Sequence, residues 1–308
     1  MTNRGIKRLL AGLSAVVLTA LAMSVPASAT TTATLSIVAH QDDDLLFMNP
    51  DIAADIKAGR EVWVTYLTAG ELPCTPEFAG HCGIDYADTR IQGERAAYST
   101  MAGVANDWQF EQMTFGGHPV AVNHLTGTQV HLIFTFIHAA AGPADNCGDL
   151  YRLITVPGFV AHPIDGRPGY TRAAFTGMLD AIIDHVDPDH IRTQSSVGHR
   201  EPDPDNIDHV TGAILVAEAD LDTAGTTRVR RDEYTGYQIR QLPDNVSPYW
   251  TTAKRAAWDA YWPHDWNLYR GVTPGHRPWD NVMAKQYHPA GRVFTPGIPW
   301  IPPADVTC

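Results

Sequence analysis

The segment of this chain with the most chemistry is an apolar run that ends in one imidazole and three carboxylates, Ile37-Val38-Ala39-His40-Gln41-Asp42-Asp43-Asp44. His40 and Asp43 carry the donor atoms of zinc ligands, because borderline-soft zinc accepts imidazole nitrogen and carboxylate oxygen. Asp42 would then be a carboxylate left free to move a proton. The same residues also suit an acidic turn that caps a helix, since Asp is a favoured N-cap residue. The segment by itself leaves both interpretations open.

A zinc site needs at least one more protein ligand, and His209 is the candidate. It lies in Asn206-Ile207-Asp208-His209, where a polar loop meets the expected start of a helix. Three protein ligands with one open position are typical of catalytic rather than structural zinc. A lone histidine at a helix start is otherwise often a surface or packing residue.

The elements that would position these residues alternate between strand-like and helix-like patterns, which indicates βα units around a mainly parallel sheet. Open α/β sheets place their sites at the carboxyl ends of buried strands, and the run before His40 has the composition of such a strand. The expected strands are 34–39, 62–67, 108–115, 130–137, 190–194 and 234–242. The expected helices are 52–58, 86–101, 171–186, 207–219 and 251–261.

Two segments, 72–85 and 142–170, are rich in Gly, Pro, His and Cys, and we expect loop insertions there that shape a cleft. The C-terminal part is rich in tryptophan: Trp250, Trp258, Trp262, Trp266, Trp279 and Trp300. Aromatic faces stack on sugar rings, so this part either walls a cleft or packs on the sheet as a cap. The clustered candidates for a wall are Tyr261, Trp262, His264 and Trp266.

Residues 1–29 have the pattern of a secretory signal peptide. Three basic residues precede an apolar run at 9–23, and Ala27-Ser28-Ala29 offers a small-residue cleavage site. The apolar run is short for a membrane span, which needs about 20 residues. We therefore expect cleavage after about Ala29, a secreted protein and no membrane span. Residues 30–308 would form one domain, with a core at about 34–220 and a C-terminal elaboration at about 221–308.

All four cysteines lie after the expected cleavage site. An even number in an exported chain favours disulfides over thiolate metal ligands. The favoured pairing joins Cys74 to Cys82, which are close in sequence, and Cys147 to Cys308. Four cysteines allow three connectivities, and the other two stay open.

The 308 residues include 22 basic and 34 acidic side chains. Loss of the three basic residues of the leader would bring the net charge to about −15. Such an acidic surface disfavours nucleic acid and anionic lipid as partners. It is compatible with a neutral or cationic substrate.

Four segments of this chain resemble the motifs of a known enzyme family. Ala39-His40-Gln41-Asp42-Asp43-Asp44 resembles the Ala-His-Pro-Asp-Asp-Glu signature of the PIG-L/LmbE-like zinc N-deacetylases. Thr68-Ala69-Gly70-Glu71 is similar to the family's Thr-x-Gly-Glu turn, and Arg90 with Glu94 to its Arg-containing helix. Asp187-Pro188-Asp189 and Asp208-His209 fall where the family has its Pro-Asp strand and its His-Pro-Asp-His end. The motifs follow the family's order, and the resemblance implies a Rossmann-like α/β sandwich.

Carried over by position, the resemblance implies that His40, Asp43 and His209 hold Zn²⁺. Asp42 would be the general base, and Arg90 would face the substrate or order the cleft. Without the family, Arg90 would be taken for a solvated helix residue. The implied reaction removes the N-acetyl group from an N-acetylglucosamine-containing conjugate, giving acetate and a free amino sugar.

Two positions depart from the family pattern. Gln41 replaces the usual Pro, which changes the rigidity of the turn more than its chemistry. Asn206 stands where the family usually has a His that is taken to stabilise the oxyanion, and an Asn amide donates a hydrogen bond but carries no proton at neutral pH. His199 is the only His of the 195–206 loop and either compensates as a catalytic residue or is a solvated loop residue.

The substrate and two rival classes stay open. An exported family member would meet a cell-envelope sugar or a secreted glycosylated metabolite, and a glycopeptide-antibiotic pseudoaglycone is the narrower alternative. A metallophosphoesterase also uses Asp and His, but it often holds two metals about 3.5–4 Å apart with more ligands than are found here. A non-catalytic sugar-binding protein with calcium in the acidic turn would need an oxygen-rich loop without His.

Overall fold

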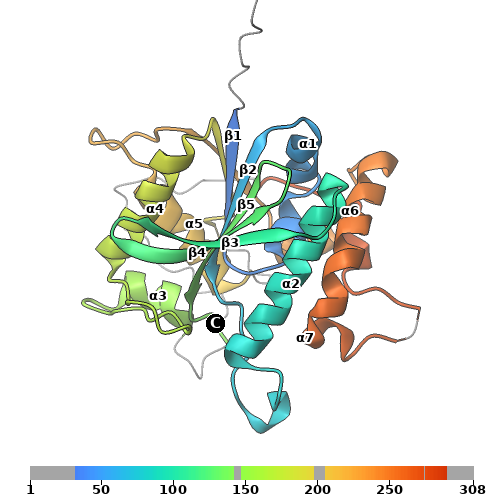
Figure 1. The fold of residues 1–308 in the computed structure, drawn as a ribbon, viewed down its shortest axis with the longest axis horizontal. Coiled ribbons are helices and arrows are strands. Elements are labelled where there is room, and N and C mark those ends of the chain that lie inside the picture. The colour runs from blue at the N-terminus through green and yellow to red at the C-terminus, as the bar shows by residue number, and fades with distance from the viewer. Residues whose placement is uncertain (1–31, 142–146, 198–204, 274, 290–308) are drawn as a thin grey trace, which may run out of the picture. The chain divides into compact units, whose positions relative to one another are not determined.

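The computed structural model describes residues 32–141, 147–197, 205–273 and 275–289. Within these ranges, seven strands form one sheet in the order β3-β4-β5-β2-β1-β6-β7 (Figure 1). The strands are β1 (Ala33–Val38), β2 (Glu61–Thr68), β3 (Trp108–Phe115), β4 (His118–Leu125), β5 (Val130–Ile137), β6 (His190–Gln194) and β7 (Arg230–Tyr234).

Parallel pairing joins five of the seven strands. Strand β1 pairs in parallel with β2 and β6, β2 with β5, and β6 with β7. Strand β4 pairs antiparallel with β3 and β5. The mainly parallel α/β sheet predicted from the sequence is therefore confirmed.

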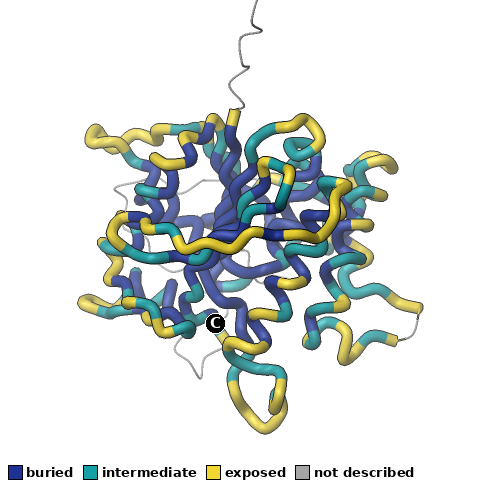
Figure 2. Tube along the Cα trace, viewed as in Figure 1, coloured by how far each residue is buried: buried dark blue, intermediate teal, exposed yellow. Residues whose placement is uncertain are grey.

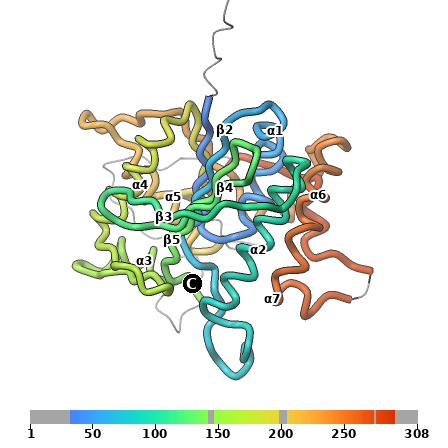
Figure 3. The backbone as a smooth tube through the Cα atoms, in the orientation of Figure 1, coloured from blue at the N-terminus to red at the C-terminus, as the bar shows by residue number. Residues whose placement is uncertain are grey.

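Helices cover both faces of the sheet (Figures 1 and 3). Apolar side chains of α3 (Gly148–Thr155), α4 (Arg172–Val186) and α5 (Ile207–Ala219) pack on one face. Those of α1 (Asp51–Lys57), α2 (Gly83–Ala102) and α6 (Pro248–Tyr261) pack on the other face, and the short α7 (Trp266–Tyr269) follows α6. This is the predicted sandwich of helices around a sheet.

Burial follows the position of each strand in the sheet (Figure 2). The central strand β1 is buried along its whole length, with Leu35 and Ile37 in the core of one face and Val38 in the core of the other. The middle of the edge strand β3 is exposed, and Phe110 is 63% accessible there. The chemistry-bearing loop after β1 therefore leaves from the best-buried part of the sheet.

Three local predictions were wrong or incomplete. The strand expected at 234–242 is wrong: β7 covers Arg230–Tyr234, with Tyr234 opposite Gln194 of β6, and Tyr237–Gln241 forms a 3₁₀ helix. The chain turns at Gly236, where a Cβ would collide with the Asp205 carboxylate.

Strand β4 and helix α3 were not predicted. The first follows the two glycines 116 and 117, whose left-handed φ values of 55° and 83° close a tight hairpin after β3. The second lies inside the segment 142–170 that was expected to be an insertion loop.

The Cys74–Cys82 disulfide is present, as predicted. The expected partner of Cys147, Cys308, lies outside the described residues, and so does the expected signal peptide at 1–29. No helix in the described ranges combines the length and the apolar composition of a membrane span.

Candidate metal centre and active site

The candidate site lies at the carboxyl end of β1, where the strand order of the sheet reverses. The chain continues from β1 to β2 on one side, whereas β6 lies on the other side of β1, and such switch points leave a crevice for a ligand. Ala39 is held from both sides: its N–H donates to Oε1 of Gln194 at 2.9 Å and its carbonyl accepts from Oγ1 of Thr68 at 2.8 Å. The residues that follow Ala39 therefore start from a fixed point.

His40, Asp43 and His209 are brought together in a buried cluster. One ligand atom from each lies within 4.8 Å of the others. Nδ1 of His40 is 3.2 Å from Oδ2 of Asp43, and Nε2 of His209 is 3.1 Å from Oδ1 of Asp43. The three ligands proposed from the sequence thus converge, with Asp43 between the two imidazoles.

The second nitrogen of each imidazole faces a further carboxylate. Nε2 of His40 is 3.1 Å from Oδ2 of Asp208, and Nδ1 of His209 is 2.7 Å from Oδ1 of Asp205. This pattern is typical of metal-bound histidines, because a carboxylate on the far nitrogen fixes the ring orientation and the tautomer. Asp205 and Asp208 were not proposed as site residues, although both flank His209 within four positions.

The residues present fit a zinc ion. Nε2 of His209 is buried and forms no well-aligned hydrogen bond among the described residues; its neighbour at 3.1 Å is Oδ1 of Asp43, the carboxylate that would share the metal. The donor set of two imidazoles and one carboxylate is one that zinc accepts in catalytic sites. Buried carboxylates crowd the cluster, and a bound cation would offset their charge.

In the absence of a metal, the neighbouring carboxylates raise the pKa values of the two imidazoles. Burial alone would lower the pKa of His209, but Asp43 and Asp205 outweigh it and raise the pKa to about 10. The pKa of His40 is raised to about 9, because Asp43 and Asp208 outweigh the effect of burial. A metal ion bound here takes the place of these protons.

Asp42 lies beside the cluster but outside it. Its φ of 92° is unusual for a residue other than glycine, and its N–H donates to Oε1 of Glu94 at 2.6 Å. The side chain lines the cavity, with Oδ1 3.0 Å from a guanidinium nitrogen of Arg90. Burial raises the pKa of Asp42 to about 7, against the lowering effect of Arg90. A carboxylate titrating near neutrality suits a general base.

Arg90 is a buried ordering residue rather than a solvated one. It forms two ion pairs, with Asp42 and with Asp265 at 3.1 Å. Its other partners are the carbonyls of Gln41 and Gly70 and the hydroxyl of Tyr261. Of the two roles implied by the family, these contacts favour ordering of the cleft.

The turn at Gly70 and Glu71 contacts residues that surround the cluster. Gly70 has a left-handed φ of 59°, and a Cβ there would collide with Arg90. Glu71 pairs with His138 and accepts the N–H of Ala139 at 3.2 Å. The next residue, Ala140, donates its N–H to Asp208 at 2.7 Å. The turn is therefore linked through the segment 138–140 to the carboxylate that orients His40.

Asn206 caps α5 and lines the cavity. Its Oδ1 accepts the N–H of Asp208 at 2.8 Å, which leaves the Nδ2 group as its hydrogen-bond donor. His199, the other candidate for stabilising the oxyanion, lies outside the described residues.

A cavity of about 250 Å³ opens over the cluster. Part of its wall comes from the C-terminal elaboration: Tyr237, Asp265, Asn267, Leu268 and Trp279. Of the four aromatic residues first expected there, Tyr261 reaches Arg90, Trp266 stacks on His81 with ring centroids 4.3 Å apart, and Trp262 and His264 line other cavities. Tyr237 was missed because it was assigned to a strand.

An α/β sheet with a His-Asp-His group and a separate carboxylate at its carboxyl edge is typical of a metal-dependent hydrolase. The profile of the GlcNAc-PI de-N-acetylase family, PIG-L, matches residues 35–219, and the chain belongs to this family. The matched region includes every residue of the His40–Asp43–His209 cluster, as well as Asp42 and Arg90. A comparison with curated proteins gave no match.

Among solved structures, the N,N'-diacetylchitobiose deacetylase of Pyrococcus horikoshii is 14% identical, with 78% of this chain and 75% of that chain covered and a TM-score of 0.42. A deacetylase of teicoplanin biosynthesis is 17% identical (80% and 95% covered, TM-score 0.42). The 4-carboxy-2-hydroxymuconate hydratase of Pseudomonas putida is 16% identical (78% and 86% covered, TM-score 0.43). These similarities are too low to transfer an activity or a substrate.

Proposed function

We propose that this protein is a secreted, zinc-dependent hydrolase that removes the N-acetyl group from an N-acetylglucosamine-containing conjugate. The observation that carries the proposal is the buried His40–Asp43–His209 cluster with Asp42 beside it, within the region matched by the de-N-acetylase family. The leader pattern at 1–29 supports secretion.

The cluster would hold the zinc ion through the two imidazoles and the Asp43 carboxylate. When bound, zinc polarises an amide carbonyl and lowers the pKa of water towards about 7. Asp42 takes a proton from the attacking water while the water oxygen bonds to the carbonyl carbon. Asn206 stands where the family usually has a histidine that stabilises the oxyanion. Its Nδ2 group would donate a hydrogen bond to the carbonyl oxygen in place of that histidine.

Collapse of the adduct breaks the C–N bond. Asp42 returns its proton to the departing nitrogen, so that acetate and a free amine leave and the carboxylate is restored. Arg90 does not react; its ion pair holds Asp42 in place and opposes the rise in the pKa of Asp42 that burial causes. The residues of the chain thus supply a base, an acid and a hydrogen-bond donor in one cycle.

One observation weighs against the phosphoesterase alternative. In the part of the chain that the structure describes, one group of His, Cys, Asp or Glu side chains is close enough to hold a metal, and it has three members. Two-metal phosphoesterases hold their ions about 3.5–4 Å apart and need more ligands.

The direct test is acetate release from simple N-acetylglucosamine glycosides by the purified protein. We expect activity that a chelator abolishes and added zinc restores, with about one zinc per chain by metal analysis. Phosphate release from phosphoesters without any acetate release would replace the proposal with a phosphoesterase. No turnover of either class, together with calcium in the protein, would favour a binding protein.

A further inference from the structure

The cavity over the metal cluster is completed by residues from outside the family region. The family profile ends at residue 219, whereas Tyr237, Leu268 and Trp279 line the cavity. Part of the surface that a substrate meets near the cluster is therefore formed by residues outside the family motifs. We call Tyr237 and Trp279 the aromatic wall.

The aromatic wall is anchored directly to the metal cluster. The ring centroid of Tyr237 lies 5.1 Å from that of His209 and 5.9 Å from that of Phe47. The Trp279 ring follows at 5.6 Å from Tyr237, tilted by 32°. An aromatic surface therefore extends outward from a metal ligand.

The indole of Trp279 is held in place on one side. The guanidinium carbon of Arg240 lies 3.7 Å from the centroid of the Trp279 ring, within the range of a cation–π contact. The ring centroid of Phe47 lies 6.3 Å from that of Trp279, with the two planes at 87°. The ring is partly exposed and lines the cavity. A ring supported in this way is a preformed surface for stacking, because little side-chain entropy is lost on binding.

Apart from the metal ion, the side-chain charges that line the cavity disfavour an anion. Asp42, Glu71 and Asp265 are among the lining residues. Apart from His40, the one cationic side chain among the described lining residues is Arg90, and its guanidinium already pairs with two of these carboxylates. Phosphate recognition in proteins commonly uses a free Arg fork or Lys, and no such group is among the described residues that line this cavity. The nearby Arg240 is not a lining residue, and its guanidinium lies on the Trp279 ring.

The N-terminus of α5 does not supply an anion site either. Helix N-termini attract anions through free N–H groups and the helix dipole. Here the Asn206 side chain already accepts the N–H of Asp208. The buried carboxylates Asp205 and Asp208 flank this end of the helix and add negative charge.

The size of the cavity limits what can enter it. At about 250 Å³ it lies below the range of about 300–1,000 Å³ that is usual for pockets holding drug-sized ligands. It suits a single sugar ring with its acetamido group, and the rest of a conjugate would lie outside.

We propose that Trp279 and Tyr237 form a stacking subsite for one uncharged N-acetyl amino sugar, and that the acidic lining rejects conjugates with a phosphate next to that sugar. The inference rests on the proposed deacetylase function and narrows its substrate class. The apolar C–H face of the pyranose would lie on the indole, with the acetamido group directed to the cluster. Trp279 is then a specificity-determining residue that acts in binding rather than in proton transfer.

The test measures binding separately from turnover. Isothermal titration calorimetry on the Asp42→Asn protein would compare methyl N-acetyl-β-glucosaminide with N-acetylglucosamine 1-phosphate, in zinc-loaded and chelator-treated protein. Inorganic phosphate alone would report any anion that binds the metal. We expect the neutral glycoside to bind at least about tenfold more tightly than the sugar phosphate, which corresponds to about 1.4 kcal/mol.

Trp279→Ala should weaken binding of the neutral glycoside by about 3- to 10-fold with or without zinc, the range expected for one aromatic contact. Trp279→Phe should recover most of that loss. In the active enzyme, Trp279→Ala should raise KM and leave kcat almost unchanged. Trp262→Ala is the matched control, because Trp262 is also half-buried but lines a different cavity. Circular dichroism would show that each variant is folded.

The outcomes separate this inference from the proposed function. Equal affinity for the neutral and the phosphorylated sugar, or unchanged binding in Trp279→Ala, would overturn the subsite even if the enzyme releases acetate. Absence of acetate release from any N-acetyl sugar, with Trp279-dependent binding intact, would overturn the deacetylase proposal and leave the sugar subsite standing.

Discussion

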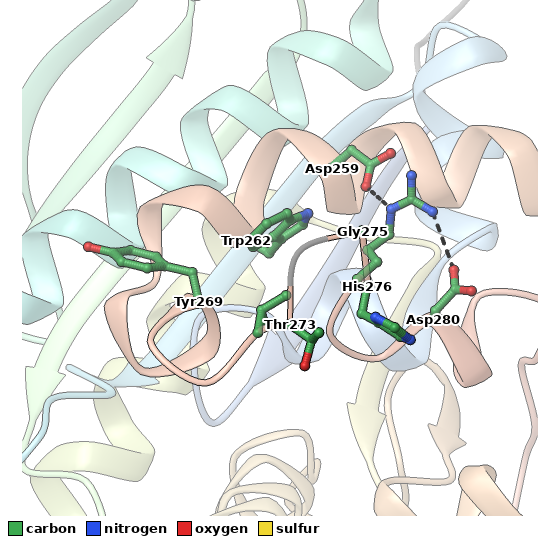
Figure 4. A pocket seen from close by; sticks show the side chains of 9 residues that line it. Asp259, Trp262, Tyr269, Thr273, Gly275, His276 and Asp280 are labelled. Atoms are coloured by element: carbon green, nitrogen blue, oxygen red, sulfur yellow. Dashed lines mark hydrogen bonds and ion pairs between the residues drawn. The ribbon is translucent and has the colours of Figure 1, made fainter.

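Among the described residues, the C-terminal part of this chain lines a cavity larger than the one over the metal cluster, and this larger cavity is not the candidate active site. The larger cavity measures about 670 Å³ and is lined by residues between 259 and 280, among them Trp262 and Tyr269 (Figure 4). The cavity over the metal cluster is smaller, about 250 Å³, but it draws on the loop after β1, the turn after β2, α2, the segment after β5, the N-cap of α5 and the C-terminal part. Catalysis needs groups that converge from several elements, so the smaller cavity is the better candidate for the active site.

The charged side chains of the two cavities differ in their exposure to solvent. In the larger one, Arg277 pairs with Asp259 and with Asp280, and all three side chains are about one-third or more exposed. Exposed pairs of this kind contribute little to stability, since water competes for them. At the metal cluster the charged groups are buried, and each has a partner from another element. Such an arrangement costs desolvation energy that a structural role alone does not explain.

The largest expected effect is the loss of a metal ligand. His209→Ala should abolish zinc binding and reduce acetate release by about 1,000-fold or more, because the metal supplies several kcal/mol of transition-state stabilisation. His276→Ala in the larger cavity is the control and should leave zinc content and activity unchanged. Comparable losses in both variants would remove the distinction between the two cavities.

Removal of the proposed base should come next. Asp42→Asn should keep about one zinc per chain and lower kcat by about 10²- to 10⁴-fold, the usual contribution of general acid–base catalysis. Asp259→Asn in the larger cavity should change kcat by less than twofold. Loss of zinc in Asp42→Asn would instead identify Asp42 as a ligand.

The carboxylate behind His209 should have an intermediate effect. Asp205→Asn removes the charge that faces Nδ1 at 2.7 Å, and such changes typically weaken metal affinity by about 10- to 100-fold. Zinc affinity measured by competition with a chelator would check this prediction. Activity in excess zinc should recover in large part, whereas unchanged zinc affinity would mean that Asp205 only shapes the loop.

The sequence was sufficient for the parts of the site that are local along the chain. His40, Asp42 and Asp43 follow one buried strand, so the end of that strand places all three, and the family pattern points to His209. The sheet was predicted for a similar reason, since hydrophobic runs reveal buried parallel strands directly. The structure brings the proposed ligands together, and their zinc binding is the prediction tested above.

The aromatic wall could not be predicted in the same way. Tyr237 contacts His209 only because the chain turns at Gly236, and the strand pattern around it suggested another conformation. Trp279 adopts a left-handed φ of 60°, which propensity does not favour for tryptophan. Both contacts join residues far apart in sequence, and no periodic pattern encodes such pairs. Asp205 and Asp208 were not proposed, because acidic residues near a helix start are common and their spacing alone does not place them behind a metal ligand.

The smallest expected effect concerns Lys254, which connects the C-terminal part to the segment after the ligand loop. Its ammonium group is buried and donates to the carbonyls of Leu46 at 2.6 Å and Lys285 at 2.7 Å. Leu46 follows the ligand loop, and Lys285 lies just beyond the segment that carries Trp279. Lys254→Met should lower the free energy of unfolding by about 1–3 kcal/mol, because two buried carbonyls lose their donor. Zinc content should not change.

The pH dependence of this variant gives an independent check. Burial lowers the pKa of Lys254 to about 7, well below its ordinary value of about 10.5. Between these two values the unfolded chain binds the proton and the folded chain does not, so the wild-type protein gains stability as the pH rises from about 7 towards 10. Lys254→Met lacks this gain, and urea unfolding at pH 7 and pH 9 should show the gap between the two proteins widening with pH. A gap that stays constant would mean that Lys254 keeps its charge in the folded protein and acts through its two hydrogen bonds alone.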